Sequence, residues 1–201
     1  CQSNLRQWGV FFSPYASEYD GSLVPPDPLL LYGFVQVLAG PSSERANLLL
    51  CPMATRPKHI EEGKSWAFGD TFSAWWVPWG GGFGTYIGSY GLNSSVSHGE
   101  IGAGRVDMRG AANIPADLDS TYPLNHVMSY LAVPPPYEDY PIFSPATGST
   151  NYSVINRHDA GVNCLFMDWS ARKVGLKELW TLKWSSTWDT AGPWTKRGGV
   201  K

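Results

Sequence analysis

Apolar side chains recur at steps of three and four along the first part of the chain, at Leu5, Trp8, Phe12, Tyr15 and Tyr19. This spacing is typical of one face of an α-helix. It predicts a helix over residues 2–20 that ends at Gly21 and packs on a sheet through Leu5, Trp8, Phe12 and Tyr15. Pro14 lies inside the pattern, where its missing backbone donor and its clash with the preceding turn cost about 3 kcal/mol. We therefore expect a kink at Pro14.

A second regular pattern lies near the end of the chain, where Val162, Cys164 and Phe166 alternate with Asn163, Leu165 and Met167. Such a run predicts a strand that is buried on both faces. After a short tip, residues 171–175 can return as the antiparallel mate, which predicts a β-hairpin at the centre of the sheet. Apolar residues at helical spacing follow, so we expect a short helix over 176–184 that closes the hairpin against the core.

The elements between these two regions are less regular. Residues 28–39 predict a second helix, with Asp27 as its cap and Pro28 in its first turn. We expect a short buried strand or extended segment over 47–52, strands near 66–68 and 84–91, and a tail anchored by Trp188 and Trp194. Residues 93–153 show little periodicity. The pattern as a whole predicts an α+β fold, in which an N-terminal helix packs on an antiparallel sheet with long aromatic-rich and Gly/Pro-rich loops.

Composition supports one folded domain over residues 1–201. The chain is 43% hydrophobic and 16% charged, which is far from the composition of disordered proteins. A net charge of -2 creates no field that would attract nucleic acid, and no stretch reaches the roughly 18 apolar residues of a membrane span. The chain begins at a cysteine inside a helical pattern, so we expect that a further segment precedes it in the natural protein.

The three cysteines lack the CxxC spacing of a zinc site. Cys164 lies inside the apolar strand and is expected to be a buried thiol. Cys1 and Cys51 would form a disulfide in an oxidising compartment if their Cα atoms come within bridging distance, a condition that sequence alone leaves open.

His158 and Asp168 stand on either side of the apolar strand, and the pair has three interpretations: catalysis, metal binding or a structural brace. Catalysis needs a nucleophile or an electrophilic stabiliser within reach, and the sequence nominates none. The Gly-rich run at 79–84 lacks the residues of a phosphate-binding loop. We favour the brace, in which each side chain bonds backbone groups at the base or tip of the hairpin for about 1 kcal/mol per bond. No enzymatic activity is expected.

Trp75, Trp76 and Trp79 offer a further choice. They could form a surface platform on which sugar rings stack, as in a secreted carbohydrate-binding module, or they could cover loops and contact neighbouring subunits. We favour packing, and the carbohydrate-binding module remains the alternative function.

Two stretches resemble a known family: "CQSNLRQWGVFFSPYASEYDG" at 1–21 and "RHDAGVNCLFMDWSARKVGLKELWTLKW" at 157–184. They are similar to bacterial prepilin-type proteins with a His-x9-Asp-Gly signature, which are akin to type II secretion pseudopilins. The signature falls here on His158, Asp168 and Trp169, with Trp169 in the place of glycine. Since that glycine normally adopts a positive φ, we expect a longer loop at the tip and a Trp169 that is free to pack. The resemblance is weaker at "LLLCPMA" and "GSYGLN".

The resemblance implies a pilin-like structural subunit. Residues 1–20 would be the remnant of a long N-terminal helix, 21–153 a loop-rich variable region, and 154–201 the hairpin, short helix and tail. In that family the precursor carries a short leader and an apolar helix with a glutamate near its mature terminus, which anchors it in the inner membrane before assembly. The expected partners are copies of the chain or related pilins, in a periplasmic or cell-surface filament of the type IV pilus or type II secretion kind.

The resemblance also implies that no cofactor is required, apart from a calcium ion that related pseudopilins often bind in a loop near the C-terminal sheet. Carboxylates suit that ion. The candidate ligands here are Asp117, Asp119, Asp139 and Asp189, and their spacing matches no known calcium loop.

Overall fold

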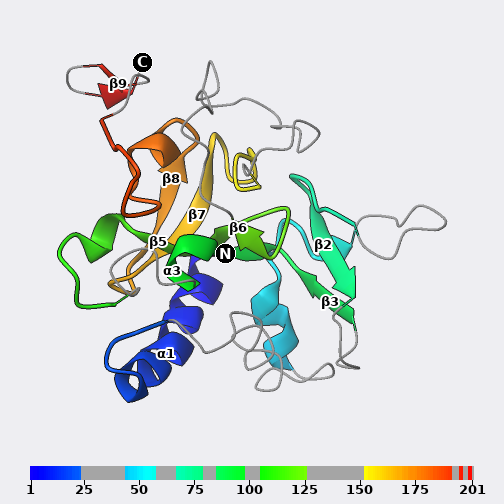
Figure 1. The fold of residues 1–201 in the computed structure, drawn as a ribbon. Helices are drawn as coiled ribbons and strands as arrows, with labels where there is room; N and C mark the ends of the chain where they lie inside the picture. The colour runs from blue at the N-terminus through cyan, green and yellow to red at the C-terminus, as the bar shows by residue number, and fades with distance from the viewer. Residues whose placement is uncertain are drawn as a thin grey trace.

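The computed structural model describes residues 1–23, 44–57, 67–78, 85–97, 105–125 and 152–191, together with the backbone of 195–196 and 199–200. Figure 1 shows a mixed α+β fold with one long helix at the N-terminus. The helix expected over 28–39 lies outside the described residues, as do Trp79, Asp139 and Trp194.

A five-stranded sheet forms the centre of the molecule, with the order β6-β4-β5-β7-β8. Its strands are β4 (Tyr90–Asn93), β5 (Pro115–Asp119), β6 (Leu124–Asn125), β7 (Gly161–Phe166) and β8 (Ala171–Gly175). The predicted hairpin is confirmed as the antiparallel pair β7–β8. Two expectations are corrected. The sheet is mixed, because β6 pairs parallel with β4, and β5 is the middle strand while β8 lies at the end of the order.

A smaller sheet consists of β1 (Arg56–Pro57), β2 (Ser73–Pro78) and β3 (Thr85–Gly88), and β9 (Thr195–Lys196) pairs with β10 (Gly199–Val200). The short helices are η1 (Glu44–Leu49), α3 (Ser94–Ser97), η3 (Ala111–Asn113) and η5 (Glu178–Thr181). The strands expected over 84–91 correspond to β3 and the start of β4. The strand or extended segment expected over 47–52 is instead the end of η1 followed by a turn, and the helix expected over 176–184 is reduced to the single turn η5.

Helix α1 (Gln2–Glu18) packs across β7 and β8. Leu5, Trp8 and Phe12 of the predicted stripe are buried, together with Ala16, while Tyr15 is half-buried at the edge. The helix continues through Pro14. It ends where Gly21, with a φ of 78°, donates its backbone N–H to Ala16 O, as expected of a glycine that closes a helix. No helix among the described residues is both long and apolar enough to cross a membrane.

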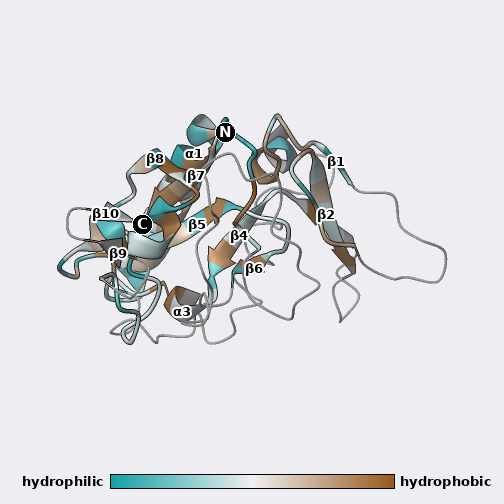
Figure 2. Ribbon diagram, turned by 90° about the horizontal axis from the view of Figure 1, so that it is seen from above, coloured by the Kyte–Doolittle hydropathy of each residue, from teal (hydrophilic) through white to brown (hydrophobic). Residues whose placement is uncertain are grey.

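The two faces of the five-stranded sheet have different cores. Leu165 and Ala171 belong to the cluster beneath α1, whereas the alternate residues of β7 belong to a second cluster with Trp180, Trp184 and Trp188. The strand period of two explains this division. Figure 1 shows α1 on one side of β7 and β8 and the C-terminal segment on the other, and Figure 2 shows apolar stretches, in brown, on β5 and β7.

The hairpin tip is a tight three-residue loop that contains Trp169. Phe166 N donates to Ser170 O and Trp169 N donates to Phe166 O, both at 2.9 Å. Trp169 has a φ of 66°, a conformation that costs a non-glycine residue about 1–3 kcal/mol. The loop at the tip is therefore longer than a two-residue turn, as expected, but only by one residue. Trp169 itself adopts the left-handed backbone conformation. Its ring lies 6.1 Å from the ring of Phe12, so the strained tip fastens the hairpin to α1.

Candidate functional site

A buried carboxylate organises the polar part of the core. Asp119, the last residue of β5, is fully buried. Its Oδ2 accepts hydrogen bonds from Asn163 N at 2.7 Å and His158 Nε2 at 3.0 Å, and its Oδ1 accepts one from Arg157 Nη1 at 3.2 Å. A buried charge requires such partners. The register of β5 against β7 brings Asn163 to this position.

Arg157 is buried with Asp119 and joins the two sheets. Its guanidinium donates to the carbonyls of Asp70 and Ser89 at 2.6 Å and to the carbonyl of Thr71 at 3.1 Å. These bonds satisfy the donors that burial takes away from water. The arginine and the carboxylate therefore form a paired charge whose partial removal would leave an uncompensated ion in the core.

His158 lies at a turn that enters β7. Asp159 and Ala160 both have positive φ, and His158 N donates to Gly161 O at 3.0 Å, the pattern of a type I′ turn. Burial lowers the pKa of the imidazole, but hydrogen bonds to Asp119 and Cys51 outweigh it and raise the pKa to about 9. For Asp119, burial raises the pKa of the carboxyl, and the interactions with His158 and Arg157 prevail and lower it. The pair is accordingly charged at neutral pH.

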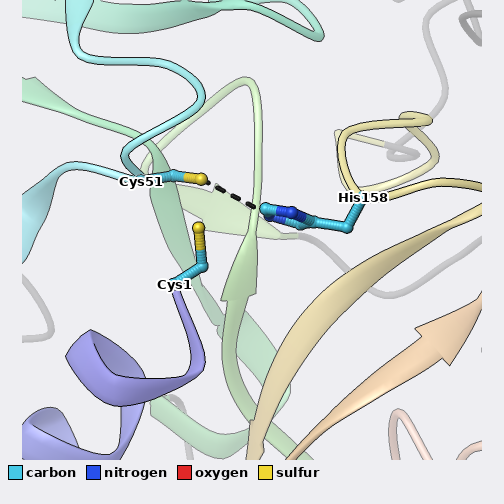
Figure 3. A group of neighbouring side chains, drawn as sticks. All are labelled: Cys1, Cys51 and His158. Carbon is cyan, nitrogen blue, oxygen red and sulfur yellow. Dashed lines mark hydrogen bonds between the residues drawn. The ribbon is translucent and has the colours of Figure 1, made fainter.

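Two cysteines complete the group. Cys51 is buried, and its Sγ lies 3.4 Å from His158 Nε2. Cys1 immediately precedes α1 and is half-buried. Figure 3 shows the two sulfurs and the imidazole turned toward a common point, and one donor atom from each residue lies within 4.8 Å of the other two. Both cysteines are free thiols. The structure thus places the two residues of the expected disulfide side by side and unbonded.

The pair His158 and Asp168 is not a pair in space, because the two residues lie beyond opposite ends of β7. Asp168 is exposed, and its Oδ1 accepts bonds from the backbone N and the hydroxyl of Ser170, as expected of a brace at the hairpin tip. The expectation for His158 is corrected: its side chain bonds a carboxylate and a thiol, not the backbone. Asp119 is its carboxylate partner. No motif spacing connects these two residues, and only strand pairing brings them together.

Cysteine, histidine and aspartate also form nucleophilic triads, but this geometry differs from a relay. A triad uses both ring nitrogens, one toward the nucleophile and one toward the carboxylate. Here Cys51 Sγ and Asp119 Oδ2 both approach Nε2, and Cys51 is fully buried. The arrangement favours holding the imidazole, not passing a proton through it.

Of the carboxylates considered for calcium, the three that the structure describes do not gather at one place. Asp117 and Asp119 are buried in β5, and Asp189 is exposed and accepts a bond from Ala191 N. Within the described part of the chain, the one group of three or more metal-donor side chains is Cys1, Cys51 and His158. Calcium prefers oxygen ligands, so this group does not suit it.

Asp117 is a second buried carboxylate with a different environment. Burial raises its pKa to about 8, and the nearby charge of Asp119 adds to the effect. The described residues give its Oδ1 no hydrogen-bond partner. The sheet register places Asp117 opposite Leu92 on β4 and Leu165 on β7, so this carboxyl lies among apolar side chains and is mostly neutral at pH 7.

Of the tryptophans considered for a surface platform, the two that the structure describes do not share one face. Trp75 is in the core, 1% exposed, and its indole N–H donates to Tyr90 O at 2.9 Å. Gly88 permits this position, because a Cβ there would collide with the indole ring. Trp76 follows Trp75 on β2, points to the opposite face and is half-buried. Trp75 and Trp76 therefore cannot belong to one flat platform for a sugar ring.

Comparisons with protein-family models, with curated proteins and with solved structures find no match to this chain.

Proposed function

We propose that this chain is the head domain of a pilin-like structural subunit, without enzymatic activity, that assembles with copies of itself or related pilins into a filament. The observation that carries the proposal is the packing of α1 across the β7–β8 hairpin. The two stretches that resemble prepilin-type proteins are the ones that meet in this contact. In this arrangement the helix would lie in the core of the filament, and the sheet with its loops would form the outer surface.

In this proposal the helix continues upstream of Cys1 as an apolar rod. Such a rod needs lipid before assembly, because an apolar helix satisfies its own backbone groups and has no favourable contact with water. In the filament it packs against the rods of neighbouring subunits. Identical heads then meet through heterologous contacts that do not close into a ring, which is the symmetry of a helical fibre.

The outward face of α1 is compatible with such contacts. Val10 lies on α1, 69% exposed, away from the buried stripe. A large apolar side chain at this position would be covered by a neighbouring head in a filament. In the proposal the subunit lies in the periplasm or at the cell surface, and the inner membrane holds it before assembly.

Expression of the gene from its natural start codon, in a bacterium that contains a type IV pilus or type II secretion assembly system, tests the proposal. We expect the protein in the inner membrane and in sheared filaments visible by electron microscopy. Replacement of Val10 by glutamate should reduce the filament fraction while the membrane fraction stays folded, and Glu18→Gln, at another exposed position of α1, is the matched control. A wild-type product that is released as a monomer and never enters either fraction would contradict the proposal.

A further inference from the structure

The thiols of Cys1 and Cys51 and the imidazole of His158 converge from three separate parts of the chain: the start of α1, the turn after η1 and the turn before β7. Sequence spacing cannot reveal such a group, because more than forty residues separate each position from the next. Two thiols and an imidazole are the donors that zinc and similar borderline metal ions prefer. We propose that Cys1, Cys51 and His158 form a binding site for a divalent zinc ion.

The separations of the donor atoms suit a tetrahedral ion. Zinc–sulfur bonds of about 2.3 Å and zinc–nitrogen bonds of about 2.0–2.1 Å place a sulfur and a nitrogen ligand about 3.6 Å apart, and two sulfur ligands about 3.8 Å apart. Cys51 Sγ lies 3.4 Å from His158 Nε2, and all three donors lie within 4.8 Å of one another. Side-chain shifts of up to about 1 Å bring the three to bonding distance around one ion.

The turn that carries Cys51 directs a backbone donor at its sulfur. Met53 N donates to Cys51 Sγ at 3.4 Å, and Ala54 N donates to Cys51 O at 2.8 Å. These bonds hold the cysteine in place, and the thiolate is the form of cysteine that binds metal. Binding at neutral pH releases three protons to solvent, one from each thiol and one from the charged imidazole of His158, so that the ion is held by two thiolates and a neutral ring.

The environment of His158 permits the exchange of a hydrogen bond for a metal bond. If Nε2 binds the ion, Asp119 still accepts bonds from Asn163 N and Arg157, so the buried carboxylate keeps two partners. Cys51 is buried, whereas Cys1 is half-buried and the His158 side chain is 16% exposed. The ion can therefore enter from the Cys1 side, and a water molecule or a ligand from outside the chain would fill the fourth position.

A disulfide between Cys1 and Cys51 is the competing outcome. A small-molecule disulfide would accept two electrons from the two thiols, forming one sulfur–sulfur bond and releasing two molecules of the reduced thiol. The product would lack both thiolate ligands. Because the two chemistries exclude each other, one experiment separates them.

The test is a titration of the chain with Co²⁺ under a non-thiol reductant, followed by displacement with Zn²⁺. A few residues added before Cys1 keep the α-amino group from acting as a ligand. We expect one ion per chain, a sulfur-to-cobalt charge-transfer band, and visible bands of tetrahedral intensity that Zn²⁺ abolishes. Cys1→Ala should weaken binding by more than the roughly 10–100-fold that follows the loss of an outer hydrogen-bond partner, with an unchanged circular dichroism spectrum.

Controls keep the outcome decisive. Cys164→Ala removes a buried thiol outside the group and should leave the charge-transfer band intact, while His158→Asn should weaken binding without removing it. Cys1 is the preferred variant because Cys51 is buried and its replacement could disturb folding. The proposal is overturned if the reduced wild-type chain gives no charge-transfer band, or if Cys1→Ala binds as wild type does. Mass spectrometry that finds a Cys1–Cys51 disulfide, with no binding after reduction, would assign the pair to the disulfide instead.

Discussion

The two faces of the five-stranded sheet carry different kinds of core. On one face, Leu118 and apolar residues of β7 and β8 join three tryptophans in a cluster of buried apolar side chains. On the other face, α1 covers apolar residues that surround two buried carboxylates, Asp117 and Asp119. The first face needs only hydrophobic burial to be stable. The second face holds charged groups that are stable only with their partners. Substitutions of those charged residues and of their partners should therefore be the least tolerated.

Asp119→Ala should have the largest effect of the variants that test this comparison. The substitution leaves Arg157 and His158 without their carboxylate, and breaking a buried ion pair from one side costs about 3–5 kcal/mol. Urea unfolding followed by tryptophan fluorescence measures the loss. A cost below about 1 kcal/mol would mean that the charged network does not hold the two sheets together.

Leu118→Ala, one residue away on the opposite face, is the matched variant. Leu118 is fully buried, and removal of such a side chain costs about 2–5 kcal/mol through lost burial and the remaining cavity. Unlike Asp119→Ala, its cost should stay constant between pH 5 and pH 8, since no titrating group loses a partner. A strong pH dependence of the Leu118→Ala cost would contradict the division of the two faces.

Asp117→Asn should show a smaller effect that grows with pH. The folded pKa of about 8 lies above the ordinary aspartate value of 3.8, so the folded state binds the proton more tightly than the unfolded state does. Stability from this group is present below the unfolded pKa and is lost as pH rises toward the folded pKa. Asparagine does not titrate, so the variant should gain at least about 1 kcal/mol relative to wild type between pH 5 and about pH 9. A gain that shrinks with rising pH would reverse the assignment.

Asp168→Ala should have the smallest effect. Its carboxylate is exposed and, among the residues that the structure describes, bonds Ser170 alone, so the loss should be about 1 kcal/mol or less. His158→Ala, at the other end of the signature, should cost clearly more, because it leaves the buried Asp119 with one partner fewer. Equal costs for the two variants would show that the signature acts as one unit at the hairpin, contrary to the geometry.

The parts of the fold that periodicity marks were predictable. The stripe of α1 and the alternation of β7 both bury their apolar residues, and the hairpin pairs as expected. The middle strand β5 was missed because "PADLD" contains two aspartates that a propensity argument excludes from a sheet core. Residues 47–49, which were expected to be extended, form the end of η1. So short an apolar run does not distinguish a strand from a helical turn in the sequence.

The candidate site was predictable only in its members, not in its contacts. His158, Cys1 and Cys51 were each singled out, but the sequence paired His158 with Asp168 and left open whether the two cysteines come together. Arg157 was overlooked, since an arginine beside a histidine resembles an ordinary surface position. A buried arginine becomes evident only when strand register places Asp119 beside it.

In the proposed function, α1 is the lower part of a longer apolar helix of a filament subunit. Mass spectrometry of the mature N-terminus, on protein recovered from cells that carry the complete gene, tests it most directly. The account predicts a mature chain that begins with about 20 apolar residues, with a glutamate near their start, ahead of Cys1. A mature chain that begins at Cys1, after removal of an ordinary secretion signal, would contradict it.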